Sequence, residues 1–126
     1  MKTAHELVLA AKNQIREVPV EDAQTLVASA DVVIDVREPD EYAAGHLAGA
    51  INLPRGLLEF KLSGTPVLDR RDLTVVLYCK NSGRAALAAN SMQSMGYINV
   101  VSISGGYEAW MEAGKPIVKA APPSFD

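Results

Sequence analysis

Cysteine is almost absent from this sequence, which contains only Cys79. A single cysteine excludes an intramolecular disulfide and a metal cluster made of cysteine thiolates, and we expect no metal or other cofactor. The lack of disulfides fits a reducing compartment. A chain of 126 residues, 48% of them hydrophobic, is long enough to be stabilised by one apolar core instead.

An excess of basic residues is also lacking, because 12 lysines and arginines face 15 aspartates and glutamates. The net charge of −3 argues against a nucleic-acid partner, since binding phosphates requires an excess of cations. Long apolar runs are missing as well. The run at residues 7–11 is shorter than the ~7–15 residues of a secretory signal or the ~20 of a membrane span. We therefore expect a cytoplasmic protein with no membrane partner.

Short apolar runs alternate with helix-like segments along most of the chain. The predicted strands cover residues 32–36, 50–53, 74–78 and 98–103, with a brief strand near Val18. The predicted helices cover residues 4–16, 21–28, 39–44, 84–95 and 105–112, with a loose helix at 56–62. Nearly continuous β-branched runs are typical of strands buried on both faces. The alternation predicts an α/β fold with a mainly parallel central sheet flanked by helices on both faces.

The two ends of the chain differ from this pattern. Residues 1–16 form a predicted helical extension, in which Leu7 and Ala11 lie on one apolar face that packs on the domain or caps a sheet edge. A dimer contact is the alternative role. The central domain is expected over residues 17–117. The alanine- and proline-containing segment 118–126 is predicted to be a disordered tail.

The chemically informative segment is the loop from Cys79 to Arg84, because it joins a buried strand to a helix. Loop amides and a helix N-terminus converge at such a junction and favour negative charge. The same field stabilises a thiolate and makes Cys79 a nucleophile. Lys80 and Arg84 add positive charge within the loop. A lone cysteine is more often an inert buried residue, but this loop composition favours the nucleophile.

Other polar residues receive weaker assignments. Asp35 and Arg37 follow a buried strand and are predicted to hydrogen-bond or ion-pair near the site, as scaffolding rather than chemistry. Arg84 either orients the substrate or braces the loop. A Cys79–His46 pair would indicate a Cys–His hydrolase, yet no third partner orients His46, so a packed histidine is the preferred interpretation.

Several motifs in order resemble the rhodanese-like domains. The first is Asp35-Val36-Arg37-Glu38, followed by Glu41-Tyr42 and the segment 45–54, which reads Gly-His-Leu-Ala-Gly-Ala-Ile-Asn-Leu-Pro. The second half is matched by the strand into Cys79, the loop to Arg84, and the segment 105–110, which reads Gly-Gly-Tyr-Glu-Ala-Trp. The resemblance covers about residues 17–117 and implies a single-domain rhodanese-like protein.

The resemblance implies a thiosulfate sulfurtransferase-type enzyme. Cys79 would take a sulfane sulfur from thiosulfate or a persulfide donor, and Lys80, Asn81, Ser82, Gly83 and Arg84 would bind the donor. The chain has no second cysteine to resolve the persulfide. The acceptor would therefore be external: cyanide, a thiol or a protein thiol.

Two alternatives remain. The cell-cycle phosphatases of the same fold resemble this domain but carry a loop one residue longer, whereas this loop has six residues from Cys79 to Arg84. Phosphatase or arsenate-reductase activity is therefore the less favoured alternative. Rhodanese-like domains also serve as non-catalytic interaction modules, but those commonly lose the cysteine. One departure from many active family loops is that Ser82 stands at the fourth position and Gly83 at the fifth. A left-handed backbone at the fourth position would strain Ser82.

Overall fold

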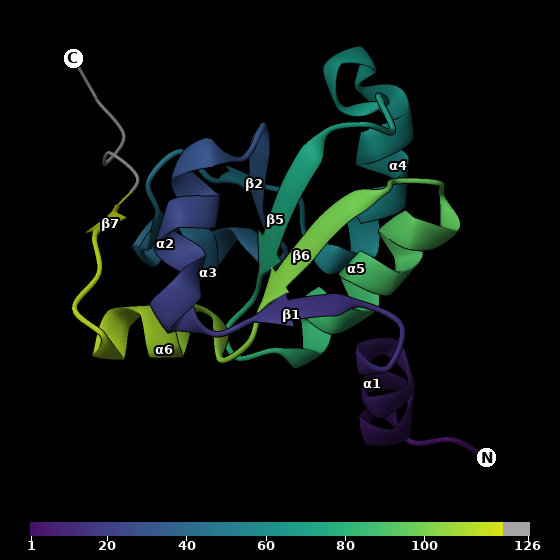
Figure 1. Ribbon diagram of the computed structural model, residues 1–126, viewed down its shortest axis with the longest axis horizontal. Helices are drawn as coiled ribbons and strands as arrows, with labels where there is room; N and C mark the ends of the chain where they lie inside the picture. Colours follow the sequence, from purple (N-terminus) through teal and green to yellow (C-terminus); the bar gives the residue numbers. More distant parts are fainter. Residues whose placement is uncertain (120–126) are drawn as a thin grey trace.

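In the computed structural model, which describes residues 1–119, a five-stranded parallel sheet lies at the centre of the protein (Figure 1). The sheet order is β1–β6–β5–β2–β4. The strands are β1 (Arg16–Val18), β2 (Val32–Asp35), β3 (His46–Leu47), β4 (Ile51–Asn52), β5 (Thr74–Tyr78), β6 (Asn99–Ile103) and β7 (Ile117–Val118). The α-helices are α1 (Ala4–Lys12), α2 (Val20–Ser29), α3 (Pro39–Ala44), α4 (Leu58–Gly64), α5 (Gly83–Ser94) and α6 (Gly106–Glu112). Short 3₁₀ helices, η1 (Arg55–Leu57) and η2 (Pro66–Leu68), flank α4.

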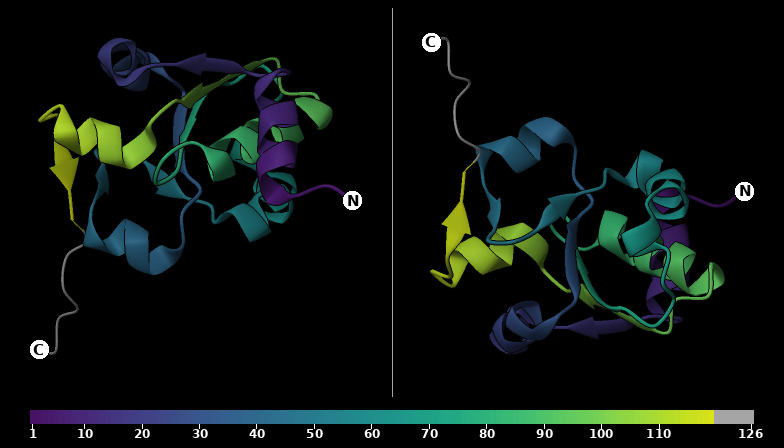
Figure 2. Two further views of the ribbon diagram at one scale, coloured as in Figure 1. Left: turned by 90° about the horizontal axis from the view of Figure 1, so that it is seen from below. Right: turned by 90° about the horizontal axis from the view of Figure 1, so that it is seen from above.

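The strands are buried on both faces, which gives the protein two apolar clusters. Val75 and Leu77 of β5 belong to the cluster under α4 and α5, whereas Val76 and Tyr78 belong to the cluster with α2 and α6. This alternation follows from the two-residue period of a strand. The helices accordingly lie on both sides of the sheet (Figure 2). The predicted α/β fold is confirmed, and β5 has the predicted bounds.

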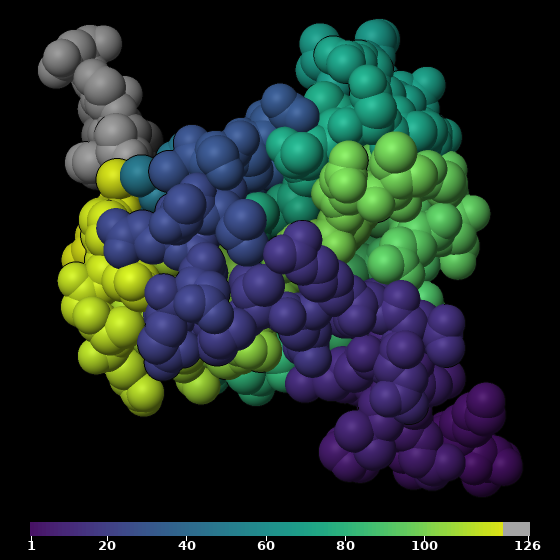
Figure 3. Space-filling model, in the orientation of Figure 1, coloured from purple at the N-terminus to yellow at the C-terminus, as the bar shows by residue number. Residues whose placement is uncertain are grey.

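The N-terminal helix is shorter than predicted and packs through a different face. It ends at Lys12 instead of residue 16, because the chain turns at Asn13 and enters β1, which pairs with β6. Leu7 is 46% exposed, while Ala11 is buried. The helix stands out from the body of the protein and contacts only part of it, chiefly α5 (Figures 1 and 3).

A second, two-stranded sheet was not predicted. In it β3 pairs with β7 in antiparallel register, so that His46 lies opposite Val118. Two-residue strands carry no measurable periodicity, so the sequence gives no local signal for them. Val118 belongs to the segment predicted to be a disordered tail, and the prediction is wrong for this residue because it lies in β7. The rest of the predicted tail from residue 120 lies outside the described residues.

The carboxyl ends of β2, β5 and β6 lie at one edge of the sheet, because neighbouring strands are parallel. Asp35 ends β2 opposite Tyr78 at the end of β5. Its carboxylate accepts hydrogen bonds from Arg37 Nε and Nη2, the shortest at 2.7 Å, and both residues are buried. Burial alone would lower the pKa of Arg37, but its bonds to Asp35 raise it above the usual value. In open parallel sheets, ligands bind at this carboxyl edge.

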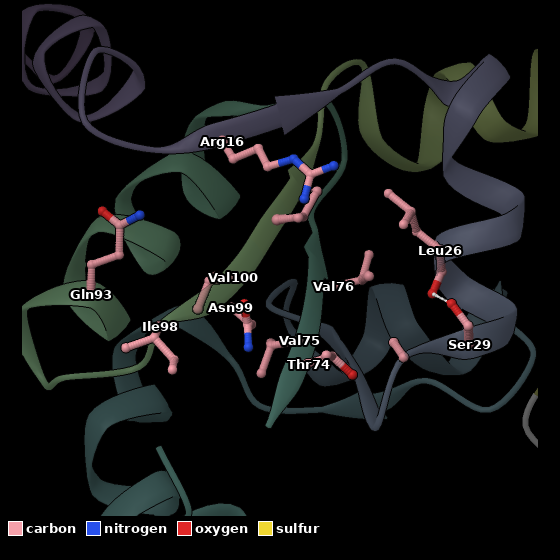
Figure 4. Close-up of a pocket in the computed structure, with 12 residues that line it drawn as sticks. Arg16, Leu26, Ser29, Thr74, Val75, Val76, Gln93, Ile98, Asn99 and Val100 are labelled. Carbon is pink, nitrogen blue, oxygen red and sulfur yellow. Dashed lines mark hydrogen bonds between the residues drawn. The ribbon is translucent and has the colours of Figure 1, made fainter. Parts of the chain in front are cut away.

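A cavity of about 260 Å³ lies at the opposite, amino end of the strands (Figure 4). Arg16 of β1, Leu26 of α2 and Asn99 of β6 contribute to its walls. Its walls include no cysteine, histidine or carboxylate among the residues described. No helix within residues 1–119 is long and apolar enough to cross a membrane.

The buried ion pair generates a stability prediction. Arg37→Leu should lower the free energy of unfolding by about 3–5 kcal/mol, because it leaves the Asp35 carboxylate buried without its counter-charge. Urea denaturation followed by circular dichroism measures the change. Arg70→Leu is the matched control, since Arg70 pairs with Asp72 at the exposed surface and its loss should leave stability nearly unchanged. Equal effects of the two substitutions would contradict the role given to the buried pair.

Candidate active site

The Cys79 sulfur lies at the amino end of α5. Cys79 directly follows β5 and is fully buried. Its Sγ accepts a hydrogen bond from the amide of Ala85 at 3.3 Å. Ala85 is the third residue of α5, so the sulfur occupies the acceptor position usually filled by an N-cap side chain. The amide and the helix dipole both favour a thiolate over a thiol at this position.

The amino end of α6 holds the other side of the loop. The amides of Tyr107 and Glu108 donate to the carbonyls of Cys79 and Lys80 at 2.8 and 3.0 Å. This approach requires a glycine at position 106, where φ is +56°. A Cβ there would lie 2.4–2.9 Å from backbone atoms of the loop. The loop carbonyls are therefore turned toward α6.

The middle of the loop is organised by Asn81. Its side-chain Oδ1 accepts a hydrogen bond from the Ser82 amide at 2.7 Å and lies 3.4 Å from the Gly83 amide. Ser82 has φ of −152°, and no residue other than glycine has a positive φ in the part of the chain described. The strain foreseen for a serine at the fourth loop position is therefore absent. Within residues 1–119, the amides of Lys80, Asn81 and Arg84 donate no hydrogen bond, and they remain available to a bound anion.

Both predicted loop cations are paired with carboxylates that were not predicted as site residues. Arg84 forms a two-pronged contact with Glu41 of α3, at 2.8 and 3.1 Å. These bonds lower the pKa of Glu41 to about 2 and raise that of Arg84. Lys80 lies 3.6 Å from Glu108 of α6. The positive charge expected at the loop is thus largely neutralised, and of the two roles left open for Arg84 the contact with Glu41 supports bracing.

The predicted supporting residues lie next to this loop. The Arg37 guanidinium, held by Asp35, stacks over the Tyr107 ring at 4.1 Å. Arg37 also donates to the Gly45 carbonyl at 2.6 Å. It thereby connects the end of β2 with α6, whose first amides hold the loop.

His46 is a buried, packed histidine, as predicted. Its Nδ1 lies 2.8 Å from the Tyr42 carbonyl, and its ring stacks on the Tyr42 ring at 3.7 Å. The ring is therefore held by local contacts within one turn of the chain. No group of three or more potential ligand side chains is placed to hold a metal ion within residues 1–119.

A cavity of about 610 Å³ opens beside the loop. Lys80 and Glu41 line it together with Arg37 and Tyr107. Cys79 is not part of the lining, since its side chain has no exposed surface. A ligand entering from this cavity therefore reaches the sulfur only after side chains over the loop move.

These features match a known family. Residues 19–113 match the model of the rhodanese-like domain. The chain belongs to the rhodanese-like domain family. Its relatives include a sulfurtransferase from Allochromatium vinosum, 35% identical over 76% of this chain and 87% of the relative. The thiosulfate sulfurtransferase GlpE of Pseudomonas entomophila is 31% identical over 78% of this chain and 86% of the relative.

A solved structure extends the similarity beyond the matched segment. It is a protein of unknown function from Rhodopseudomonas palustris, described as a possible tyrosine phosphatase. The two are 33% identical with a TM-score of 0.85, covering 94% of this chain and 96% of the other. This rhodanese-like protein therefore has both sulfurtransferase relatives and a phosphatase-like structural neighbour.

The close contact at Gly106 predicts that adding one methyl group displaces the loop. Gly106→Ala should lower the free energy of unfolding by about 1–3 kcal/mol and alter the alkylation rate of Cys79, because the Cβ meets loop backbone that cannot move aside alone. Iodoacetamide labelling followed by intact mass, together with thermal denaturation, measures both effects. Gly64→Ala is the control, since nothing lies within 4 Å of its Cβ position. A Gly106→Ala variant with wild-type stability and labelling rate would refute the contact.

The Glu41–Arg84 pair predicts an unusual titration. The Glu41 carboxyl should titrate with a midpoint near pH 2 by carbon NMR. Because this lies below the ordinary value of 4.5, the pair stabilises the fold above pH 4.5, and that contribution is lost as the pH falls through about 2. In Arg84→Gln the midpoint should move up toward 4.5, whereas Arg70→Gln should leave it in place. A wild-type midpoint near 4.5 would show that the pair does not form in solution.

Proposed function

We propose that this rhodanese-like protein is a sulfurtransferase that carries a sulfane sulfur as a persulfide on Cys79. The supporting observation is the hydrogen bond from the Ala85 amide to the sulfur, at the start of a helix and within a six-residue loop. A sulfur in that position is stabilised as the thiolate, which is the form of cysteine that attacks a sulfur donor. The names of the relatives support the same reaction class.

The proposed first step is attack of the Cys79 thiolate on the outer sulfur of the donor. With thiosulfate, a new S–S bond forms to Cys79, the S–S bond of thiosulfate breaks, and sulfite leaves with the electron pair. The free amides of Lys80, Asn81 and Arg84 would stabilise the charge on the transferred sulfur. Such preorganised donors act best where they need no rearrangement during the reaction.

The second step discharges the persulfide to an external nucleophile. The acceptor attacks the outer sulfur, and Cys79 leaves again as the thiolate, so no net oxidation of the protein occurs. No other cysteine in the chain can take over the sulfur. Cyanide would give thiocyanate, while a thiol or protein thiol would become a persulfide. A cytoplasmic setting, which keeps acceptor thiols reduced, stays part of the proposal.

Phosphate chemistry is the second candidate, favoured by the Rhodopseudomonas palustris neighbour. A phosphate-binding arginine presents its planar fork to the phosphate oxygens. Here the fork of Arg84 faces Glu41 with both terminal nitrogens. The short loop and this engaged arginine favour sulfur over phosphate as the transferred group.

Mass spectrometry of the intact protein tests the proposal. Treatment with thiosulfate should add one sulfur atom to the wild type, because Cys79 retains the transferred sulfur until an acceptor arrives. Cyanide should then remove it. Cys79→Ser should gain nothing, and Ser91→Ala, in which the cysteine is intact, serves as a control that should behave as the wild type.

Two results would redirect the assignment. The wild type could gain no sulfur from thiosulfate or from a small persulfide, and transfer none from either donor to cyanide. That result would indicate a non-catalytic interaction module. Rapid hydrolysis of an aryl phosphate that depends on Cys79 would indicate a phosphatase. Gain of sulfur only from the persulfide would retain the sulfurtransferase and exclude thiosulfate as its donor.

A further inference from the structure

The first helix contacts the catalytic loop although it lies outside the family match at residues 19–113. The Lys12 ammonium at the end of α1 donates a hydrogen bond to Ser82 Oγ at 2.8 Å. Val8, one turn earlier, lies 3.6 Å from the position of a Cβ on Gly83. Figure 2 shows α1 beside α5 on the same side of the sheet. Two successive loop residues are thus covered by the N-terminal helix.

The Ser82 hydroxyl is available for this contact because other atoms cap α5. Ser82 occupies the N-cap position, where a serine oxygen normally accepts from a helix amide. It makes no such bond. The Ala85 amide, which a serine at the N-cap would normally bind, donates to the Cys79 sulfur instead. The serine oxygen turns to Lys12 instead.

Lys12 is itself held in place from the sheet side. Its Nζ lies 3.7 Å from Glu17 Oε2 on β1. That oxygen is buried and has no hydrogen-bond partner among the residues described. The Lys12 side chain is only 29% exposed. An ammonium between a carboxylate and a hydroxyl has a defined position, unlike a solvated surface lysine.

We propose that α1 is part of the active site and that Lys12 is a positioning residue for the catalytic loop. Through Ser82 it fixes the turn between Cys79 and α5, so that the Ala85 amide stays directed at the sulfur. The Rhodopseudomonas palustris structure covers 94% of this chain, so most of the segment outside the family match has a counterpart there.

The effect on sulfur transfer rests on the proposed function, but the coupling of Lys12 to Cys79 does not. The test therefore uses two readouts on the full chain. One is the pH dependence of Cys79 alkylation by iodoacetamide. Its midpoint reports the thiolate without any sulfur donor, whereas the absolute rate also reports how readily the side chains over the buried sulfur move. The other is the rate of persulfide formation with thiosulfate. Thermal unfolding checks that each variant is folded.

Lys12→Gln should slow alkylation at neutral pH about fivefold and shift the alkylation profile to higher pH, because the turn at Ser82 loses the hydrogen bond that keeps the Ala85 amide directed at the sulfur. Lys12→Arg should restore most of the rate. Ser82→Ala should resemble Lys12→Gln, and the double variant should be no slower than the slower single one, since both break the same contact. Lys61→Gln, an exposed change of equal charge on α4, is the matched control.

Each outcome decides between the two proposals. Lys12→Gln that matches Lys61→Gln in both readouts, or additive effects with Ser82→Ala, would overturn the role of Lys12. Slowed alkylation in a protein that never gains sulfur would support Lys12 as a positioning residue while refuting the sulfurtransferase. Normal sulfur gain together with an unshifted alkylation profile in Lys12→Gln would support the sulfurtransferase and refute Lys12 as a positioning residue.

Discussion

The close approach of α6 to the loop is the constraint on which the site depends. Two amides at the start of α6 bind the carbonyls of Cys79 and Lys80, and Gly106 is the residue that lets the two backbones meet. A peptide unit whose carbonyl is directed outward presents the neighbouring amide to the other side. The loop can therefore offer amides to a bound sulfur only while α6 keeps its carbonyls occupied. Arg37 supports the arrangement from β2 by stacking on Tyr107.

The electrostatic field at the loop differs from what the number of its cations alone would indicate. Lys80 and Arg84 each face a glutamate, so little free positive charge is left from them. The sulfur is then stabilised mainly by fixed dipoles: the Ala85 amide, the start of α5 and the free loop amides. Such dipoles are short-ranged and act on an atom inside the ring formed by the loop. This arrangement acts on a sulfur atom held within the loop and adds little long-range attraction for an anion in solution.

Most of the fold and the centre of the site could be predicted from the sequence, because both depend on residues that follow one another in the chain. The run from Thr74 through Cys79 to Arg84 specifies strand, loop and helix with local signals alone.

The partners of the loop could not be found in this way. Glu41 lies 43 residues from Arg84, and Lys12 lies 70 residues from Ser82. Neither has a spacing that marks it, and only the folded chain brings them together. From the sequence, Gly106 is part of a helix start and of the motif at residues 105–110, whereas the need for a glycine there comes from loop backbone elsewhere in the chain.

The complete burial of Cys79 connects these points to the reaction. A thiolate shielded from solvent is protected from unwanted oxidation, but it also cannot meet a donor without movement of the residues that cover it. The exposed Lys80–Glu108 pair at the adjoining cavity is a weak surface interaction and can open at little cost. Two other contacts do not involve this pair: Lys12 donates to Ser82, and Arg37, which also lines the cavity, is held by the buried carboxylate of Asp35. Opening the Lys80–Glu108 pair therefore breaks neither of these contacts, so a donor can enter while the amides remain directed at the sulfur.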